Sequence, residues 1–406
     1  MKSRKTLRPS SPVKFKSFLL WVLISLFFFV ENACNFSFTV VGPDIQKSLD
    51  LTYQQYAHLA ASFISAYSFM MVPAGILLDR FSFFKVSSIA LGIFSLACVI
   101  FSFAESFYVL MTARVIMGFS ASFSLLSSLK YSRLEFESYM GLFSALALSM
   151  GMLGGIFARY PTYFFFNHYG QKGLYLMWAL VAAILAISLW ILAPKNRFDE
   201  LKKIEVRHCL RAVKRMDFWL IALYGALAYS PFLVMEMAWS ERFLKTILTA
   251  SVDQINLIDS LSFIGVIVGS IYLGYLSDRA QSRRGGLILS ALGIFFSLIG
   301  LIYFSYGDLW WAGTLLFVMG FFTGGFMPAF AYLVARFPSR ESASVMGLMN
   351  AVNMTGGALI TPAIGAGIDA LQATGTMRPL EIYQNVLIVL PLMALLAVIL
   401  IFQVRD

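Results

Sequence analysis

The chain has 406 residues, of which 59% are hydrophobic and only 13% are charged. Soluble domains carry about 25% charged residues, so a water-soluble fold cannot enclose this much apolar surface and a membrane protein is expected. Backbone groups in lipid must be paired internally, which leaves helices or closed barrels. Because the apolar runs are long and continuous rather than alternating, they predict an all-α protein of spanning helices.

The net charge of +10 does not indicate a nucleic-acid-binding protein, because the basic residues lie in loops between apolar runs. Cys34, Cys98 and Cys209 are scattered, and they form neither a disulfide framework nor a metal site. No ATP-binding motif is present and nothing indicates a bound cofactor. Energy for any transport is therefore expected to come from a gradient or from the solute itself.

Twelve apolar runs are of spanning length. The first follows a basic tail, as in a signal peptide, but it is about 25 residues long, contains Glu31 and lacks a clear cleavage site, so we interpret it as a helix. In chain order the predicted spans are 17–41, 54–78, 86–104, 107–129, 138–158, 173–193, 217–238, 254–276, 286–306, 309–334, 344–366 and 382–403.

The distribution of basic residues predicts the orientation of these helices. With the N-terminus inside, 24 of the 31 Lys and Arg residues fall on inside segments, six fall on outside loops and Arg114 lies within a helix. Since basic residues prefer cytoplasmic loops, both termini are expected in the cytoplasm. The basic loop 194–216 is interpreted as a solvated cytoplasmic linker between an N-terminal half, residues 1–193, and a C-terminal half, residues 217–406.

A repeat relates the two halves. A motif after the second span recurs 199 residues later: Gly75, Asp79, Arg80 and Lys85 match Gly274, Asp278, Arg279 and Arg284. The segment MGF at 117–119 recurs at 319–321, and MGLFSALALSMG at 140–151 is followed by MGLMNAVNMTGG at 346–357. The preserved order predicts a duplicated six-helix unit, an arrangement that transporters use.

Two six-helix halves, a basic central loop and a repeated Gly-x-Leu-x-Asp-Arg motif resemble the major facilitator superfamily. This resemblance implies alternating access and a conformational latch at the eight motif residues, although Ser82, Phe84 and Gln281 depart from the family pattern. The basic residues could cap helix ends or pair with acids, and Gly75 could admit a neighbouring helix. A simple orientation signal is the alternative.

Polar residues at membrane depth are costly and usually face a cavity or a partner. The candidate substrate or coupling residues are Glu31, Asn32, Asn35, Arg114, Glu236, Asn350 and Asn353. By contrast, the third, sixth, ninth and twelfth spans have no charged residue in their cores, which suits peripheral helices facing lipid.

The heights of Glu31 and Arg114 can be estimated from the helix rise of 1.5 Å per residue. Both lie in the outer half of the membrane, level within about one turn, so we hypothesise that they pair. Arg114 has no counterpart in the second half, where Leu316 stands at the matching place, and this favours a substrate contact over a structural pair. Its guanidinium suits a carboxylate, which points to an anionic or zwitterionic solute.

Several other polar residues allow two interpretations. Glu31 could carry a coupling proton. Glu236 is more simply a surface acid near the outer end of its helix than a coupling site, and Asn350 and Asn353 could line a cavity or join helices. The glycines of GMLGG at 151–155 allow tight helix packing, while the absence of a Gly-Pro pair there weakens an efflux assignment.

Three segments, 59–80, 113–130 and 353–369, look like the phagosomal-transporter subgroup of intracellular bacteria, which implies proton-linked uptake of an amino acid or nucleoside. An efflux antiporter or a peptide importer is an alternative, and a transport-inactive receptor or scaffold is a remote one. An enzyme is not expected, because the three histidines are dispersed and no hydrolase motif occurs. We expect a monomer in a bacterial inner membrane, with a small solute and protons as its partners.

Overall fold

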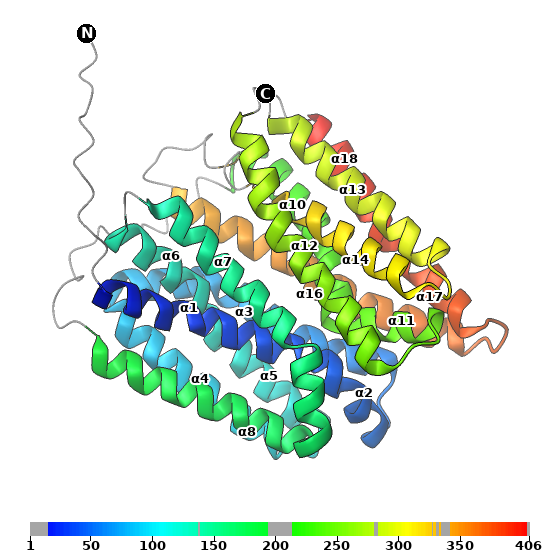
Figure 1. The fold of residues 1–406 in the computed structure, drawn as a ribbon, viewed down its shortest axis with the longest axis horizontal. Coiled ribbons are helices and arrows are strands. Elements are labelled where there is room, and N and C mark those ends of the chain that lie inside the picture. The colour runs from blue at the N-terminus through cyan, green and yellow to red at the C-terminus, as the bar shows by residue number, and fades with distance from the viewer. Residues whose placement is uncertain are drawn as a thin grey trace, which may run out of the picture.

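In a computed structural model of the chain, residues 15–136, 139–193, 213–279, 283–326, 328–329, 333 and 342–403 are described. Nearly all of them belong to helices that lie side by side (Figure 1). The first half contains α1 (Phe15–Phe36), α2 (Phe38–Ser48), α3 (Tyr53–Arg80), α4 (Phe83–Ser102), α5 (Phe107–Ala121), α6 (Phe123–Glu135), α7 (Met140–Phe157) and α8 (Tyr160–Leu192).

The second half contains α10 (Met216–Val234), the π-helix η2 (Met235–Trp239), α11 (Ser240–Ile247), α12 (Val252–Arg279), α13 (Arg283–Phe304), α14 (Leu309–Thr323), α16 (Ser342–Gln372), α17 (Pro379–Leu387) and α18 (Val389–Gln403). Most of the predicted central loop, residues 194–212, lies outside the described residues.

The described residues contain ten helices that are long and apolar enough to cross a membrane. The other two predicted spans correspond to shorter apolar helices, Leu146–Phe157 and Leu309–Thr323. A multi-pass helical membrane protein is thereby confirmed, and the count of twelve stays a prediction. We call the end with the α2–α3, α11–α12 and α16–α17 connections the outer end, following the predicted orientation (Figure 1).

The sequence gives local reasons for where these helices begin and break. Thr52 and Gln55 form a capping box at the start of α3, in which each side chain accepts a hydrogen bond from the other residue's backbone N–H. Gly170 adopts a φ of 65°, which interrupts the helical geometry inside α8. Pro231 lies within α10 just before η2, where a proline removes a helical hydrogen bond and promotes irregular winding.

Glycines set the closest helix contacts. A Cβ at Gly118 in α5 would lie 2.1 Å from the Phe63 carbonyl oxygen in α3, and one at Gly320 in α14 would lie 1.9 Å from the Ser262 carbonyl oxygen in α12. The predicted tight packing at the 151–155 glycines is confirmed, because a Cβ added to Gly155 would lie 2.2 Å from Cε1 of the Phe263 ring in α12. That last contact joins the first half to the second.

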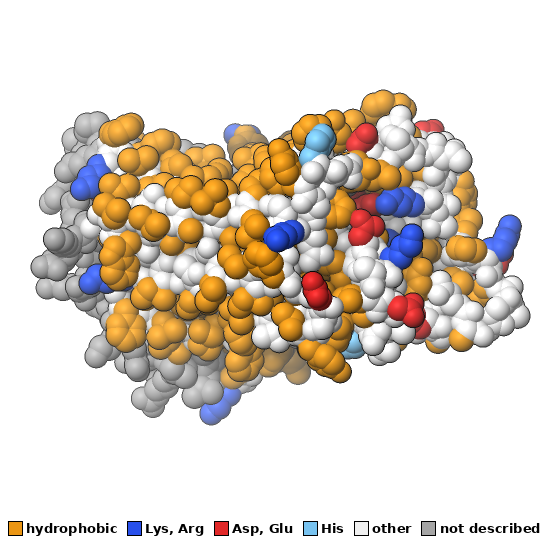
Figure 2. Space-filling view, turned by 90° about the horizontal axis from the view of Figure 1, so that it is seen from below, with side chains coloured by type: hydrophobic (Ala, Val, Ile, Leu, Met, Phe, Trp, Pro, Cys, Tyr) orange, Lys and Arg blue, Asp and Glu red, His pale blue; other side chains and the backbone are white. Residues whose placement is uncertain are grey.

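Apolar side chains cover the outside of the helices. Figure 2 shows them over most of one face, with acidic side chains gathered toward the outer end and basic side chains spread over both ends. As predicted, α4, α8, α13 and α18 each carry several exposed large apolar residues, such as Leu96, Ile191, Phe296 and Ile399. This surface suits the hydrocarbon of a bilayer.

Candidate functional site

The carboxyl group of Glu31 lies buried in the middle of the first half. It accepts hydrogen bonds from Asn32 Nδ2 at 3.1 Å and from Ser124 Oγ at 3.2 Å. Tyr67 of α3 and Tyr229 of α10 lie within electrostatic range of this carboxyl. Glu31 therefore lies inside the first half but within electrostatic range of the second, and its hydrogen-bond partners among the described residues are neutral.

Arg114 is enclosed by neutral groups. Its Nε donates to the Leu59 carbonyl at 2.8 Å, and its Nη2 donates to the Ala60 carbonyl at 2.9 Å and to Asn35 Oδ1 at 3.0 Å. The guanidinium also lies 4.3 Å from the ring centre of Phe38. Its Nη1 makes no hydrogen bond within the described part of the chain, so this buried cation has no carboxylate partner there.

The hypothesised ion pair between Glu31 and Arg114 is not formed, and that prediction is wrong for this conformation. Asn35, one turn beyond Glu31 on α1, occupies the position beside the guanidinium instead. The height of a residue along its helix fixes its depth but not its direction around the axis, and Glu31 points toward Ser124 of α6.

A second group of charges lies at the outer end. Arg159, between α7 and α8, contacts Glu236 in η2 through an ion pair, and its Nε lies 2.9 Å from Asp259 Oδ2 in α12. All three side chains are fully buried. We call Arg159, Glu236 and Asp259 the outer cluster; it joins the first half of the chain to the second.

Irregular backbone supports the outer cluster. The Glu236 carbonyl lies in the π-helix and accepts from Arg159 Nη2 at 3.0 Å and from Thr39 Oγ1 at 3.3 Å. A π-helix shifts the backbone pairing, and such segments occur frequently at functional sites. Thr39 also accepts a hydrogen bond from Arg159 Nη1 at 2.5 Å, and Ser240 donates to Asp259.

The outer cluster corrects the sequence interpretation in two places. Because the fifth predicted span ends at residue 158, the sequence predicts Arg159 in an outside loop, and it favours Glu236 as a surface acid, but both side chains are inaccessible to solvent. Asp259 was not recognised at all, although an aspartate inside the eighth predicted span is the kind of residue that marks a functional site in membranes.

The two asparagines of α16 differ in their surroundings. Asn350 donates to Met71 Sδ of α3 at 3.9 Å, which brings it to the boundary between the halves. Asn353 is fully buried beside Gly225 of α10, and its amide has no hydrogen-bond partner within the described residues. The structure gives neither of them a hydrogen bond to Glu31 or Arg114.

The predicted latch is only partly described, because the side chains of Asp79, Arg80 and Asp278 lie outside the described part of the structure. Lys85 and Arg279 are exposed. Arg284 donates to the Phe402 carbonyl at 2.7 Å, so it caps the end of α18 within its own half.

The close approach of a neighbouring helix that is expected at Gly75 is not observed within the described residues. Among the described residues, a Cβ added to Gly75 or to Gly274 would meet nothing within 4 Å. Neither glycine is therefore needed for packing against the described helices, and a gating role for the motif stays a prediction.

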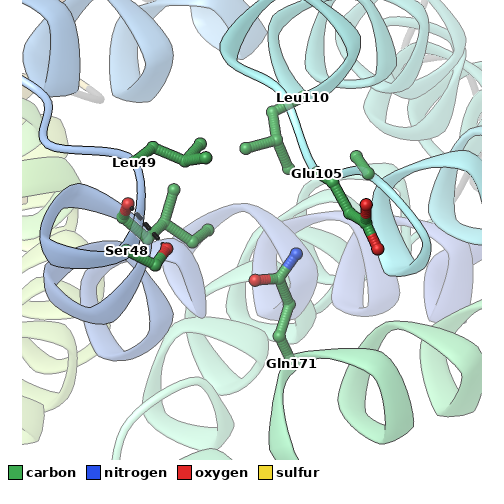
Figure 3. Close-up of a pocket in the computed structure, with 7 residues that line it drawn as sticks. Ser48, Leu49, Glu105, Leu110 and Gln171 are labelled. Carbon is green, nitrogen blue, oxygen red and sulfur yellow. Dashed lines mark hydrogen bonds between the residues drawn. The ribbon is translucent and has the colours of Figure 1, made fainter.

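A pocket of about 240 Å³ opens near the outer end of the first half. Figure 3 shows Ser48 and Leu49 on one side, Glu105 and Leu110 on the other, and Gln171 pointing between them. Its lining contains none of the predicted site residues, although Leu110 lies one helical turn before Arg114 on α5.

Asp369 of α16 adds a contact across the halves. Its two carboxylate oxygens accept from the backbone N–H groups of Tyr53 at 2.9 Å and Gln54 at 2.7 Å, at the start of α3. A carboxylate there complements the partial positive charge of the helix N-terminus.

We expect Asp369→Asn to lower the free energy of unfolding by about 1 kcal/mol, because the amide loses the negative charge and one acceptor. Thermal unfolding of the purified protein in detergent measures this. Asp44→Asn, at an exposed position of α2, is the matched control and should leave the midpoint unchanged. Equal midpoints for both variants would argue against a stabilising role for Asp369.

Ten apolar spans and buried ionisable residues where the two halves meet define a multi-pass membrane protein of the transporter class. The sequence matches the Major Facilitator Superfamily over residues 20–241 and 235–406. The chain belongs to this family, whose members are transporters and not enzymes, and it is expected to bind a small solute within a lipid bilayer.

Three curated relatives show the breadth of the similarity. The chain is 23% identical over 330 residues to a "Probable sulfoacetate transporter" of Cupriavidus necator, covering 75% of this chain and 72% of that protein. It is 23% identical to a "Probable nitrate/nitrite antiporter" of Thermus thermophilus, covering 68% and 66%. It is 34% identical over 113 residues to a "Probable hexose phosphate transport protein" of Chlamydia pneumoniae, covering 26% of this chain and 24% of the relative.

Solved structures share the fold. A bacterial homologue of the human lysosomal transporter Spinster, in an inward-facing and unoccupied conformation, superposes with a TM-score of 0.78 at 14% identity, over 97% of both chains. The occupied inward-facing form of such a homologue gives a TM-score of 0.75. At this identity the likeness establishes the fold alone.

Proposed function

We propose that the protein is a secondary active transporter that imports a small anionic or zwitterionic nutrient, such as an amino acid, together with protons. The two halves, residues 1–193 and 217–406, would alternate around a site between them. A bacterial inner membrane is the proposed location, and a monomer the proposed unit. The finer assignment to the phagosomal-transporter subgroup is part of this proposal.

The observation that carries the proposal is the buried Arg114, whose hydrogen-bond partners in the described part of the chain are all neutral. Burying a cation without a counter-charge is costly. The carboxylate of a solute would supply that charge and would accept two parallel hydrogen bonds from the guanidinium fork. Asn35 would yield its place beside Nη2 when the solute arrives.

Glu31 is the proposed coupling group. A buried carboxylate without a cation nearby is costly to leave charged, whereas its protonated form retains the hydrogen bonds to Ser124 and Asn32. Tyr229 lies within electrostatic range of Glu31 across the boundary between the halves, so a change of charge there would be felt by both.

The names of the relatives support an anionic solute. Sulfoacetate, nitrate and hexose phosphate are all anions, and the proteins named for them share this family. The buried contacts at the outer end and the likeness to inward-facing structures fit a conformation that is closed to the outside.

The test is uptake of a labelled amino-acid mixture by cells that express the wild type, Arg114→Ala or Arg114→Lys, with and without a protonophore. We expect Arg114→Ala to lower uptake about ten- to hundredfold, the value of one hydrogen-bonded charge contact. Arg114→Lys keeps the charge but not the fork and should weaken apparent affinity.

Arg378→Ala, which removes an exposed arginine at the outer end, is the control and should transport normally. Size-exclusion profiles confirm that each variant is folded. Wild-type uptake by folded Arg114→Ala would refute the role of Arg114. No protonophore-sensitive uptake of any anionic or zwitterionic solute by the wild type would refute the proposed function.

A further inference from the structure

The outer cluster joins four segments that are far apart in the sequence. Arg159 comes from the junction of α7 and α8, Glu236 from η2 and Asp259 from α12, while Thr39 of α2 contacts both Arg159 and the Glu236 backbone. Because Arg159 and Thr39 belong to the first half and the two acids to the second, the halves cannot separate here without breaking these contacts.

The charges of the outer cluster do not balance. It holds two carboxyl groups and one guanidinium, and all three side chains have an exposed fraction of 0%. Glu236 Oε1 has no hydrogen-bond partner within the described residues. If both acids were ionised, one negative charge would remain in a site without access to water, which is strongly unfavourable.

The neighbouring charges do not supply the missing positive charge directly. The nearest further ion pair is neutral overall: Glu241 of α11 acts electrostatically on Arg159 and Asp259, and its carboxylate pairs with Lys245 at 2.5 Å. The positive charge of Lys245 is therefore balanced by Glu241 and does not compensate the outer cluster. Arg242 of the same helix lies over the Tyr56 ring at 3.9 Å, facing the tyrosines of α3 and α17.

On the other packed elements, the remaining charged groups are engaged or face solvent. Asp369 of α16 caps α3. The exposed charged residues are Asp44 and Lys47 of α2, His58 of α3, Lys172 of α8 and Asp253 of α12.

We propose that the outer cluster is a proton-binding gate, which closes the outer end only when its two carboxyl groups share one bound proton. On closure a carboxylate oxygen forms an O–H bond with a proton from hydronium in the outer water. On opening that bond breaks and water takes the proton back. The proton therefore returns to the side from which it came and is distinct from the coupling proton proposed at Glu31.

This gate rests on the proposed alternating access, and it predicts how the outer pH acts. A low outer pH favours the closed outer end. A high outer pH leaves two carboxylates against one guanidinium, and their repulsion, no longer screened by water, favours opening.

The experiment measures the gate without any solute. Spin labels at Lys47→Cys, on the first half, and Ala373→Cys, on the second, report the distance across the outer end in lipid vesicles. The native cysteines Cys34, Cys98 and Cys209 are replaced by alanine. Both label positions are exposed. Distance distributions are recorded from about pH 5 to about pH 9, a range in which perturbed carboxyl groups titrate.

We expect the ratio of short to long distances in the wild type to fall about tenfold for each pH unit once the proton leaves, as a one-proton linkage requires. Glu236→Gln and Asp259→Asn remove one acid each and should keep the outer end closed at every pH. Arg159→Met should hold it open. Asp253→Asn, an exposed acid on the same helix as Asp259, is the control and should respond like the wild type.

A wild-type distribution that does not change with pH would overturn the proposal, as would an unchanged pH response in both Glu236→Gln and Asp259→Asn. The result is separable from the proposed function. A pH-dependent outer distance combined with no protonophore-sensitive uptake would leave the gate standing and reject the coupled importer, and the opposite pair of results would reject only the gate.

Discussion

Valine in place of Gly118 or Gly320 is expected to remove most of the folded protein. An added Cβ would lie 2.1 Å from the Phe63 carbonyl oxygen in the first case and 1.9 Å from the Ser262 carbonyl oxygen in the second. Both obstacles are backbone atoms in the middle of long helices, which no side-chain rotation can clear. We expect a cost of about 3 kcal/mol or more, the upper range for overpacked interiors.

Thermal unfolding and the yield of monodisperse protein in detergent measure this effect. Gly75→Val and Gly274→Val are matched controls, because a Cβ at either position meets nothing within 4 Å in the part of the chain that the structure describes. If Gly118→Val unfolded at the same temperature as Gly75→Val, the result would contradict the close approach of α5 to the Phe63 carbonyl of α3.

These two glycines also show how far the repeat extends. Gly118 contacts Phe63, and Gly320, 202 residues later, contacts Ser262, which lies 199 residues after Phe63. The same pair of helices therefore meets at the same place in each half. In the sequence, the MGF segment recurs after 202 residues and the Asp-Arg motif recurs after 199. These two offsets predict that the contact between Gly118 and Phe63 is repeated between Gly320 and Ser262.

The spans were predictable because lipid selects for continuous apolar runs, and such runs can be counted along the chain. Polar contacts between distant helices leave no such signal. Arg159 looked like a loop residue because it follows the end of a predicted span, yet it folds back into the protein between α7 and α8. Only tertiary packing brings it to Glu236 and Asp259.

Arg114 illustrates the same limit at depth. The sequence placed it correctly as a buried intramembrane cation, since charged residues there face the protein interior. Its partners are backbone carbonyls of Leu59 and Ala60, and carbonyls are not distinguishable in a sequence. Among charged side chains, Glu31 is the acid whose predicted depth in the membrane is nearest to that of Arg114, so the sequence favours that pair. The observed side-chain partner is Asn35, one turn further along α1.

Glu31→Gln is expected to abolish accumulation while leaving the solute pathway intact. Glutamine has nearly the same shape, and its Oε1 can still accept from Ser124 and Asn32, so the fold around α1 and α6 should not change. What it cannot do is bind and release a proton. Solute should still cross, but only until its concentrations on the two sides are equal.

The size of this effect follows from the driving force. A zwitterionic solute carried with one proton moves one net charge, which at 100 mV gives about 2.3 kcal/mol, or about fiftyfold accumulation. We expect that ratio in wild-type vesicles with an imposed potential, and a ratio of about one for Glu31→Gln under the same potential. Glu105→Gln, an exposed acid beside the outer pocket, serves as the control and should accumulate solute like the wild type.

Counterflow, the exchange of labelled for unlabelled solute across the membrane, separates coupling from binding. Exchange does not require net proton movement, so Glu31→Gln should exchange solute at a rate close to that of the wild type. If Glu31→Gln accumulated solute fiftyfold with an unchanged dependence on pH, the coupling proton would have to reside elsewhere. If it lost exchange as well, Glu31 would act in solute binding rather than in coupling, because only a binding defect stops both processes.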